Sequence, residues 1–266
     1  MAGQTLKIIT MKNLTLLLIF PIIYGICSFN QDKSLKVANK TIKTLENKPF
    51  AIVQLFTSQG CSSCPSADAL LEKVEKEYEG KSVFVLSYHV DYWNRLGWKD
   101  VFSKKEFSDM QYSYSSKFGS SSVYTPQAIV NGDVHFVGSN EAKMDGYLAK
   151  YLKMNSENTL VFSDLNMKDN QVTFNYKVEG NVTEKKLKVA LAIEKKETNV
   201  KRGENSGHKL SSVNIVVEQI EISLGKTEGS GSITVPGLVE KEDPLVLIGF
   251  IQSQNFNITA AAQEKI

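Results

Sequence analysis

The pattern of apolar and polar positions changes from strand-like to helix-like within residues 51–65, AIVQLFTSQGCSSCP. Residues 51–56 form an uncharged run with β-branched and aromatic members, which predicts a strand buried on both faces. From Ser62 onward, apolar residues recur at helical spacing, and Pro65 suits the first turn of a helix because its missing N–H leaves no hydrogen bond unmade there. The pattern therefore predicts a strand, a short turn and a helix that begins at the two cysteines.

The alternation of strand and helix patterns continues to about residue 152. A second strand is predicted at 82–89, and because a helix connects it to the first strand, the two should run parallel. The further elements expected are a helix at 103–118, strands at 127–130 and 134–137 around Asn131-Gly132-Asp133, and a helix at 140–152. Parallel strands end at the same edge of a sheet, so His89, Asp91 and Trp93 should lie near the cysteines.

Only strand-like segments follow residue 159. They are expected at 160–165, 171–178, 187–193, 213–222, 230–235, 245–252 and 256–261. Short strands separated by turn residues, without a helical pattern, predict a β-sandwich domain at 159–266.

A long interruption at 195–210 divides these strand-like segments. Long loops are often functional, but a structural surface loop explains the same pattern, and the sequence favours neither. If the loop reaches the cysteines, Glu204, Asn205 or His208 would shape the access of a substrate.

The N-terminus has the pattern of an export signal. A short basic start at 11–13 precedes an apolar stretch at 14–26, which is shorter than the ~20 residues that span a bilayer. We therefore interpret 1–27 as a signal peptide or N-terminal anchor and 28–48 as a polar tether, and expect the protein to be exported. Whether Cys27 is lipidated or removed stays open, and membrane contact is expected only through this segment.

Composition narrows the possible functions. The chain is 42% hydrophobic and 23% charged, which is typical of a globular protein, and its formal net charge of +2 gives no electrostatic argument for binding nucleic acid. The sequence contains no nucleophile-elbow, Walker or dinucleotide-binding motif, so it gives no support to hydrolase or nucleotide chemistry.

The cysteine pair carries the candidate chemistry. At a helix N-terminus, unpaired N–H groups and the positive end of the helix dipole stabilise a thiolate, which makes Cys61 the predicted nucleophile. Cys64, one turn later on the same face, is placed to resolve a mixed disulfide. Such a pair needs no cofactor beyond its own disulfide. A crosslink over so short a loop stabilises little, so redox activity is favoured over a purely structural bond.

Two alternatives remain beside the redox interpretation. Two thiolates and His89 offer soft ligands for Cu(I), so the protein could be a copper carrier. It could also be a binding module without turnover. Structural zinc is not favoured, because it needs four ligands, and no metal is assigned.

Four stretches resemble the motifs of a family of secreted bacterial thioredoxin-like proteins, known as domain of unknown function 1223. They are LFTSQGCSSCPSADALL, HVDYWNRLGWKD, VYTPQAIVNG and RGENSG. The resemblance implies a thioredoxin fold at 49–155, and hence an α/β thioredoxin-like domain followed by an all-β sandwich-like domain. It further implies that Pro126 follows a cis peptide bond beside the cysteines and that Thr125 contacts the substrate.

One departure from the thioredoxin pattern affects the proton transfer. Thioredoxins bury an acid on the strand before the cysteine pair, whereas Gln54 occupies that stretch here. The proton of Cys64 would then pass to another group, such as His89, Asp91 or water.

The resulting hypothesis is an exported thiol-disulfide oxidoreductase that exchanges disulfides with proteins or small thiols. Cys61 and Cys64 react, Thr125 and Pro126 bind the substrate, and His89, Asp91, Trp93, Glu204 and Asn205 are supporting candidates. The sequence does not specify the substrate, the redox partner, the direction of electron flow or the oligomeric state.

Overall fold

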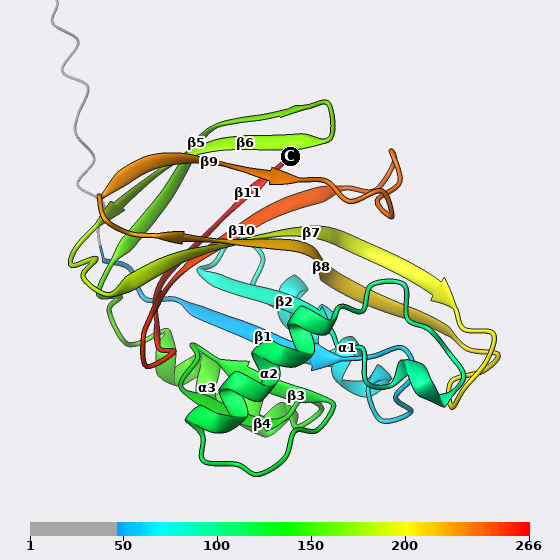
Figure 1. Cartoon of the computed structure of the whole chain (residues 1–266). Helices are drawn as coiled ribbons and strands as arrows, with labels where there is room; N and C mark the ends of the chain where they lie inside the picture. Colours follow the sequence, from blue (N-terminus) through cyan, green and yellow to red (C-terminus); the bar gives the residue numbers. More distant parts are fainter. Residues whose placement is uncertain (1–46) are drawn as a thin grey trace, which may run out of the picture. The chain divides into compact units, whose positions relative to one another are not determined.

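The structure of the protein, a computed structural model, describes residues 47–266. It contains an eight-stranded sheet of order β11-β10-β7-β8-β2-β1-β3-β4 and a three-stranded sheet of order β5-β6-β9 (Figure 1). The predicted export segment 1–27, Cys27 and nearly all of the tether at 28–48 lie outside the described residues. Within the described part, no helix has the length and apolarity needed to cross a membrane.

The elements before residue 152 follow the predicted order closely. They are β1 (Ala51–Thr57), α1 (Pro65–Glu77), β2 (Val83–His89), the 3₁₀-helix η1 (Asn94–Leu96), α2 (Lys105–Lys117), β3 (Gln127–Val130), β4 (Val134–Val137) and α3 (Glu141–Tyr151). The predicted parallel pairing of the first two strands is confirmed: β1 and β2 pair from Ala51↔Val83 to Thr57↔His89.

The remaining elements are all strands, as the pattern indicated. They are β5 (Thr159–Lys168), β6 (Gln171–Glu179), β7 (Lys185–Asn199), β8 (Lys209–Ser223), β9 (Glu228–Thr234), β10 (Leu245–Ser253) and β11 (Ile258–Lys265). β7 and β8 are longer than predicted, so the connection between them is shorter than the interruption expected at 195–210.

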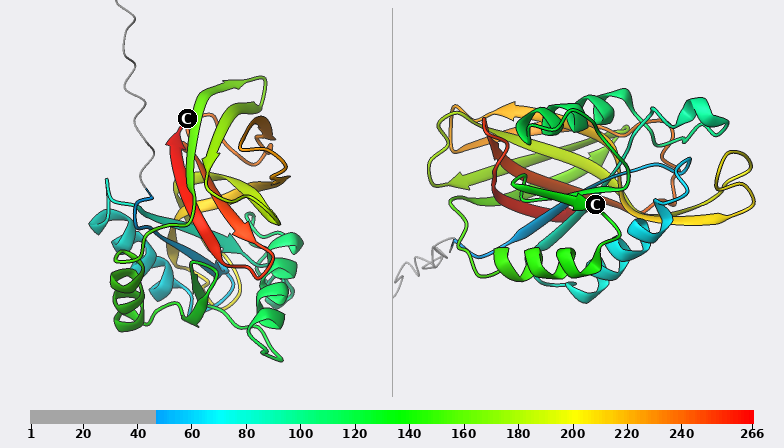
Figure 2. Two further views of the ribbon diagram at one scale, coloured as in Figure 1. Left: turned by 90° about the vertical axis from the view of Figure 1, so that its left-hand side faces the viewer. Right: turned by 90° about the horizontal axis from the view of Figure 1, so that it is seen from below.

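β1 lies inside the sheet and is buried along its whole length, which explains its uncharged sequence. Because side chains alternate along a strand, Val53 and Leu55 face a core with α1 and α3, whereas Ile52 and Phe56 face a core with α2. Figure 2 shows α1 and α3 on one side of this strand and α2 on the other. The cysteine helix α1 is therefore supported by one face of β1 only.

The predicted fold class, an α/β thioredoxin-like domain followed by a separate β-sandwich, is wrong. β2 pairs with β8 at Ser87↔Ile215, which joins strands from both predicted regions into one mixed sheet. Side chains from both regions also share a hydrophobic core: Phe56 of β1 and Phe250 of β10 belong to the same cluster. Alternation along the chain shows which positions are buried, but it does not show which strands pair, and this is why the sequence suggested a division.

Candidate functional site

Cys61 and Cys64 form a disulfide at the start of α1, with their Cα atoms 5.4 Å apart. Cys64 occupies the N-cap position and Pro65 begins the helix, so the first turn carries backbone N–H groups without helical partners. Both cysteines have 0% of their surface exposed. The sulfur atoms are therefore at a helix N-terminus, as the sequence predicted, but they are covered in this state.

Thr125 contacts the disulfide at Cys61 and is followed by Pro126. The Thr125–Pro126 peptide bond is cis, which confirms the conformation that the family resemblance implied. Thr125 Oγ1 donates to Cys61 Sγ over 3.3 Å, and Trp93 Nε1 donates to Thr125 Oγ1 over 2.8 Å. Because Trp93 donates to the oxygen of the Thr125 hydroxyl, the hydroxyl proton does not point at Trp93 and is available to donate to Cys61.

The loop between β7 and β8, residues 200–208, reaches the cysteines from the far end of a long hairpin. Asn205 Nδ2 donates to the carbonyl oxygens of Gln59 and Cys61, both at 2.9 Å. Glu204 Oε2 accepts from Ser62 N over 3.0 Å, and hydrogen bonding from Ser62 lowers the pKa of Glu204. The structure thus brings Glu204 and Asn205 to the predicted site, where they cover the backbone around Cys61.

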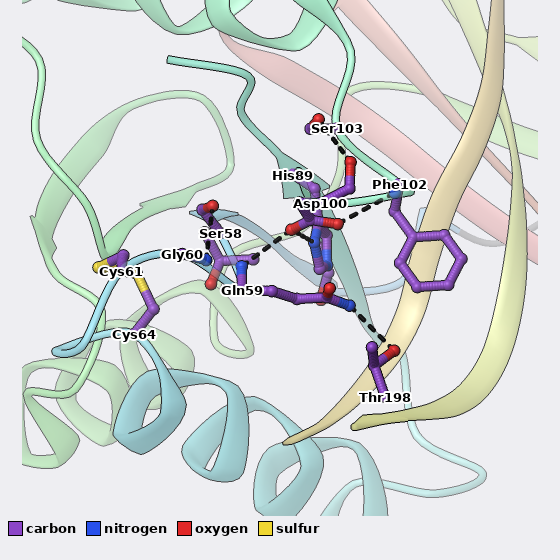
Figure 3. A network of polar contacts seen from close by, with 12 residues as sticks. Ser58, Gln59, Gly60, Cys61, Cys64, His89, Asp100, Phe102, Ser103 and Thr198 are labelled. Atoms are coloured by element: carbon purple, nitrogen blue, oxygen red, sulfur yellow. Dashed lines mark hydrogen bonds and ion pairs between the residues drawn. A yellow bond between two sulfur atoms is a disulfide. The ribbon is translucent and has the colours of Figure 1, made fainter. Parts of the chain in front are cut away.

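A buried ion pair supports the turn that precedes Cys61. His89 Nδ1 lies 2.7 Å from Asp100 Oδ2, and Asp100 also accepts from Gln59 N over 2.8 Å and from Phe102 N over 3.0 Å. Figure 3 shows Ser58, Gln59 and Gly60 between this pair and the disulfide. His89 therefore acts on the cysteine turn through Asp100 and the backbone of Gln59.

The pKa values of this pair shift in opposite directions. Burial lowers the pKa of His89, but the Asp100 carboxylate outweighs it, so the pKa of His89 is raised. Burial raises the pKa of Asp100, but His89 and the two backbone N–H donors outweigh it, so the pKa of Asp100 is lowered. The pair is thus ionised, as a buried acid and base that satisfy each other should be.

Gln59 connects the same turn to two other segments. Trp98 Nε1 donates to Gln59 Oε1 over 3.0 Å, and Gln59 Nε2 donates to Thr198 Oγ1 over 3.0 Å. Trp98 also packs against Gly203: a Cβ placed on this glycine would lie 3.2 Å from the Trp98 Cβ. The turn before Cys61 is consequently fixed by the segment after β2 and by the β7–β8 hairpin together.

Asp68 is the site residue that the sequence reasoning missed. Only 7% of its surface is exposed, and it accepts a hydrogen bond from Thr57 Oγ1 over 3.0 Å. Burial raises the pKa of Asp68 to about 7. The signal was its position four residues after Cys64, which places both side chains on the same face of α1.

Two other polar residues named from the sequence lie elsewhere. Gln54 Oε1 accepts from Tyr114 OH over 2.6 Å, so Gln54 faces α2 on the opposite side of β1 from the cysteine helix. Asp91 Oδ1 accepts from Ser108 Oγ over 2.5 Å and thus contacts α2 instead of the cysteines.

No cluster of three or more His, Cys, Asp and Glu side chains suited to a metal ion occurs among residues 47–266. His89 Nδ1 is paired with Asp100, and His208 Nδ1 lies 3.3 Å from the carbonyl oxygen of Asn205.

The fold and the site define a mixed-sheet protein with a buried CxxC disulfide beside a cis-proline. A family model described as "Protein of unknown function (DUF1223)" matches residues 52–252, so the chain belongs to this family. This confirms the membership in domain of unknown function 1223 that the sequence motifs indicated, while the match shows neither a thioredoxin fold nor secretion.

Two solved structures show what this chain is similar to. Protein AGR_C_4864 from Agrobacterium tumefaciens is 28% identical with a TM-score of 0.62, over 81% of this chain and 94% of that chain. A domain of the outer membrane lipoprotein Omp28 from Porphyromonas gingivalis is 15% identical with a TM-score of 0.26, over 42% of this chain and 96% of that chain, which is too distant to carry an argument. No curated protein matches significantly.

Proposed function

We propose that this protein is a thiol-disulfide oxidoreductase in which Cys61 and Cys64 are the reacting pair. The observation that carries the proposal is the donor hydroxyl of Thr125, which is directed at Cys61 Sγ beside the cis bond to Pro126. A donor at this sulfur stabilises a thiolate, and the N-terminus of α1 acts in the same direction.

In the reduced protein, the Cys61 thiolate attacks one sulfur of a substrate disulfide. A bond forms between Cys61 Sγ and that sulfur, and the other substrate sulfur leaves as a thiolate. Cys64 then loses its proton, attacks Cys61 Sγ and expels the second substrate thiolate. The substrate gains two electrons, the cysteines lose two, and the same steps run backward when the protein oxidises a dithiol.

Access to Cys61 requires the covering groups to move, since neither cysteine is exposed in the oxidised state. Thr125 contacts Cys61 Sγ, and the side chains of Glu204 and Asn205 hold the loop 200–208 against the backbone around Cys61. The loop forms the tip of a hairpin and Glu204 is exposed, so we propose that this loop opens to admit the substrate. Protein or small-molecule thiols are the proposed partners, and export through the N-terminal segment is the proposed route.

The complete burial of the pair favours a second candidate function, in which the disulfide only crosslinks the start of α1. The two functions differ in whether the bond opens under mild conditions. A bond that serves as a crosslink stays closed to small thiols, whereas a redox pair exchanges with them.

The test is insulin reduction in the presence of dithiothreitol, with wild type, Cys61→Ser and Cys64→Ser. Wild type should turn over, Cys61→Ser should be inactive, and Cys64→Ser should accumulate a mixed disulfide on Cys61, detected by mass spectrometry. If the wild-type bond resists dithiothreitol in the folded protein and insulin reduction stays at the background rate, the crosslinking function is correct instead.

A further inference from the structure

Asp68 is a buried carboxyl group with an unused acceptor on the face of α1 that carries Cys64. Its Oδ2 accepts from Thr57, but its Oδ1 has no hydrogen-bond partner among the described residues. The backbone ties it to Cys64, because Asp68 N donates to Cys64 O over 3.0 Å. Buried polar atoms are nearly always satisfied, so an unsatisfied carboxylate oxygen in this position requires an explanation.

A second unpartnered atom belongs to a residue on the same face of the sheet. His89 Nε2 is buried and has no hydrogen-bond partner in the described part of the chain, while Nδ1 is held by Asp100. Thr57 and His89 are register partners on β1 and β2, so their side chains lie on the same face of the sheet. Since Thr57 bonds Asp68, and since His89 lowers the pKa of Asp68, His89 and Asp68 lie on the same side of the sheet within electrostatic reach of each other.

The charges facing Asp68 come from each element packed around it. His89 on β2 lowers the pKa of Asp68, Asp100 from the segment beyond β2 raises it, and Thr57 on β1 contributes only a hydroxyl. The His89 cation partly balances a negative charge on Asp68, while Asp100 limits that balance. A carboxyl group in this setting can gain or lose a proton without leaving a large unpaired charge in the core.

We propose that Asp68 accepts the proton of Cys64 when Cys64 attacks the mixed disulfide on Cys61. This inference rests on the proposed function and assigns the base that the sequence did not reveal. In the step, the proton leaves Cys64 Sγ for the Asp68 carboxylate, the sulfur electron pair forms the bond to Cys61 Sγ, and the bond to the substrate sulfur breaks. The substrate thiolate leaves with that electron pair, and Asp68 later returns its proton to solvent.

The pKa of Asp68, which burial raises to about 7, suits this role. A proton acceptor works best when its pKa lies near the working pH. Above pH 7 the carboxylate predominates and can take the proton, and below pH 7 the protonated acid predominates and cannot. The step should therefore slow as the pH falls through about 7.

The first test is carboxyl-detected NMR of the wild-type protein, with the Asp68 signal assigned through its correlations to the backbone of the same residue. If Asp68 is coupled to the thiols, its apparent pKa should rise by about one unit on reduction, because nearby sulfur charge opposes its ionisation. Asp109, an exposed acid paired with Lys105 on α2, is the matched control and should not shift. An Asp68 pKa that is identical in both redox states overturns the inference.

The second test measures how fast Cys64 resolves a mixed disulfide formed at Cys61 with a small aromatic thiol. Loss of a general base typically costs at least ~10²-fold, so Asp68→Asn should slow resolution by about that factor at pH 8, whereas Asp109→Asn should match wild type. A wild-type rate in a folded Asp68→Asn protein also overturns the inference while leaving the oxidoreductase function intact.

If the pKa of Asp68 depends on the redox state but insulin is not reduced, the coupling of Asp68 to the thiols is upheld and the proposed function is rejected. If Asp68→Asn does not fold, the NMR measurement on wild type is the deciding test.

Discussion

At the scale of single residues, the site depends on how each polar hydrogen is directed. Trp93 donates to the Thr125 hydroxyl, and the hydroxyl in turn donates to Cys61 Sγ. A threonine without the tryptophan could point its proton elsewhere, so two residues far apart in sequence act as one donor. The aromatic side chain thus acts on Cys61 through the Thr125 hydroxyl.

Thr125→Val removes this donor with little change of shape. A hydrogen bond to a charged group contributes about 1.5–3 kcal/mol, so the pKa of the Cys61 thiol should rise by about one unit or more. At pH 7 the reduced variant should react with iodoacetamide about tenfold more slowly than wild type. Thr125→Ser keeps the hydroxyl and should retain most of the rate; an unchanged rate in Thr125→Val would show that the hydrogen bond is unimportant.

The sequence predicted some site residues and not others for physical reasons. The helix start at Cys61 and Cys64 follows from a local pattern, whereas the cis bond before Pro126 was implied only by the family resemblance. Asp68 and Asp100 are acids, which normally remain in water, so nothing in the sequence pattern placed them in the interior. Their burial depends on Thr57 and His89, partners brought close only by the folded sheet.

At the scale of elements, the hairpin of β7 and β8 is the main departure from the sequence analysis. The strands continue to pair from Lys195↔Val213 to Asn199↔Lys209, within the segment interpreted as a long interruption. Side chains of residues 195–199 lie mostly at the surface, so no apolar alternation marks this part of the strand. Backbone hydrogen bonds, which leave no trace in composition, hold it in the sheet.

Asn205→Ala should loosen the hairpin tip over the cysteines. The change leaves the carbonyl groups of Gln59 and Cys61 without their donor, at a cost of about 1–3 kcal/mol. A water-soluble phosphine should then reduce the disulfide about tenfold faster, as followed by thiol release with time. The neighbouring Ser206 Oγ donates to Lys201 O within the same loop. Ser206→Ala should therefore behave as wild type. Equal rates in all three proteins would mean that the loop does not limit access.

At the scale of the whole molecule, the regions before and after residue 159 share one sheet and one hydrophobic cluster. β2 and β8 meet at Ser87↔Ile215, and Ser87 Oγ donates to Val213 O over 2.7 Å. The hydrophobic cluster around Phe56 also draws residues from β7, β10 and β11. Separation of the two regions would therefore expose the edge of β2 and the α2-facing side of β1.

A fragment of residues 47–158 is accordingly expected not to fold alone. It should lack near-ultraviolet circular dichroism and a cooperative urea transition, whereas residues 47–266 should unfold in a single transition. Co-expression with residues 159–266 should restore the signal if the shared core is the cause. A fragment that unfolds cooperatively on its own would show that the first region is an independent domain.

Pairing between distant strands is the part of the fold that the sequence could not supply. The runs at 82–89 and 213–222 both indicate buried strands, but the sequence of neither run specifies which strand it pairs with. An apolar strand satisfies its backbone equally well against several partners, and only the joint packing of both sheet faces selects one.

The fifteen-residue lengths of β7 and β8 also set how far the hairpin loop extends from the centre of the sheet to the cysteines. One residue removed from either strand would draw the tip back by ~3.3 Å and turn the following side chains to the other face. Insertions and deletions among relatives should therefore be rare in β7 and β8. They should occur instead in turns whose length does not position the site, such as the turn joining β5 to β6.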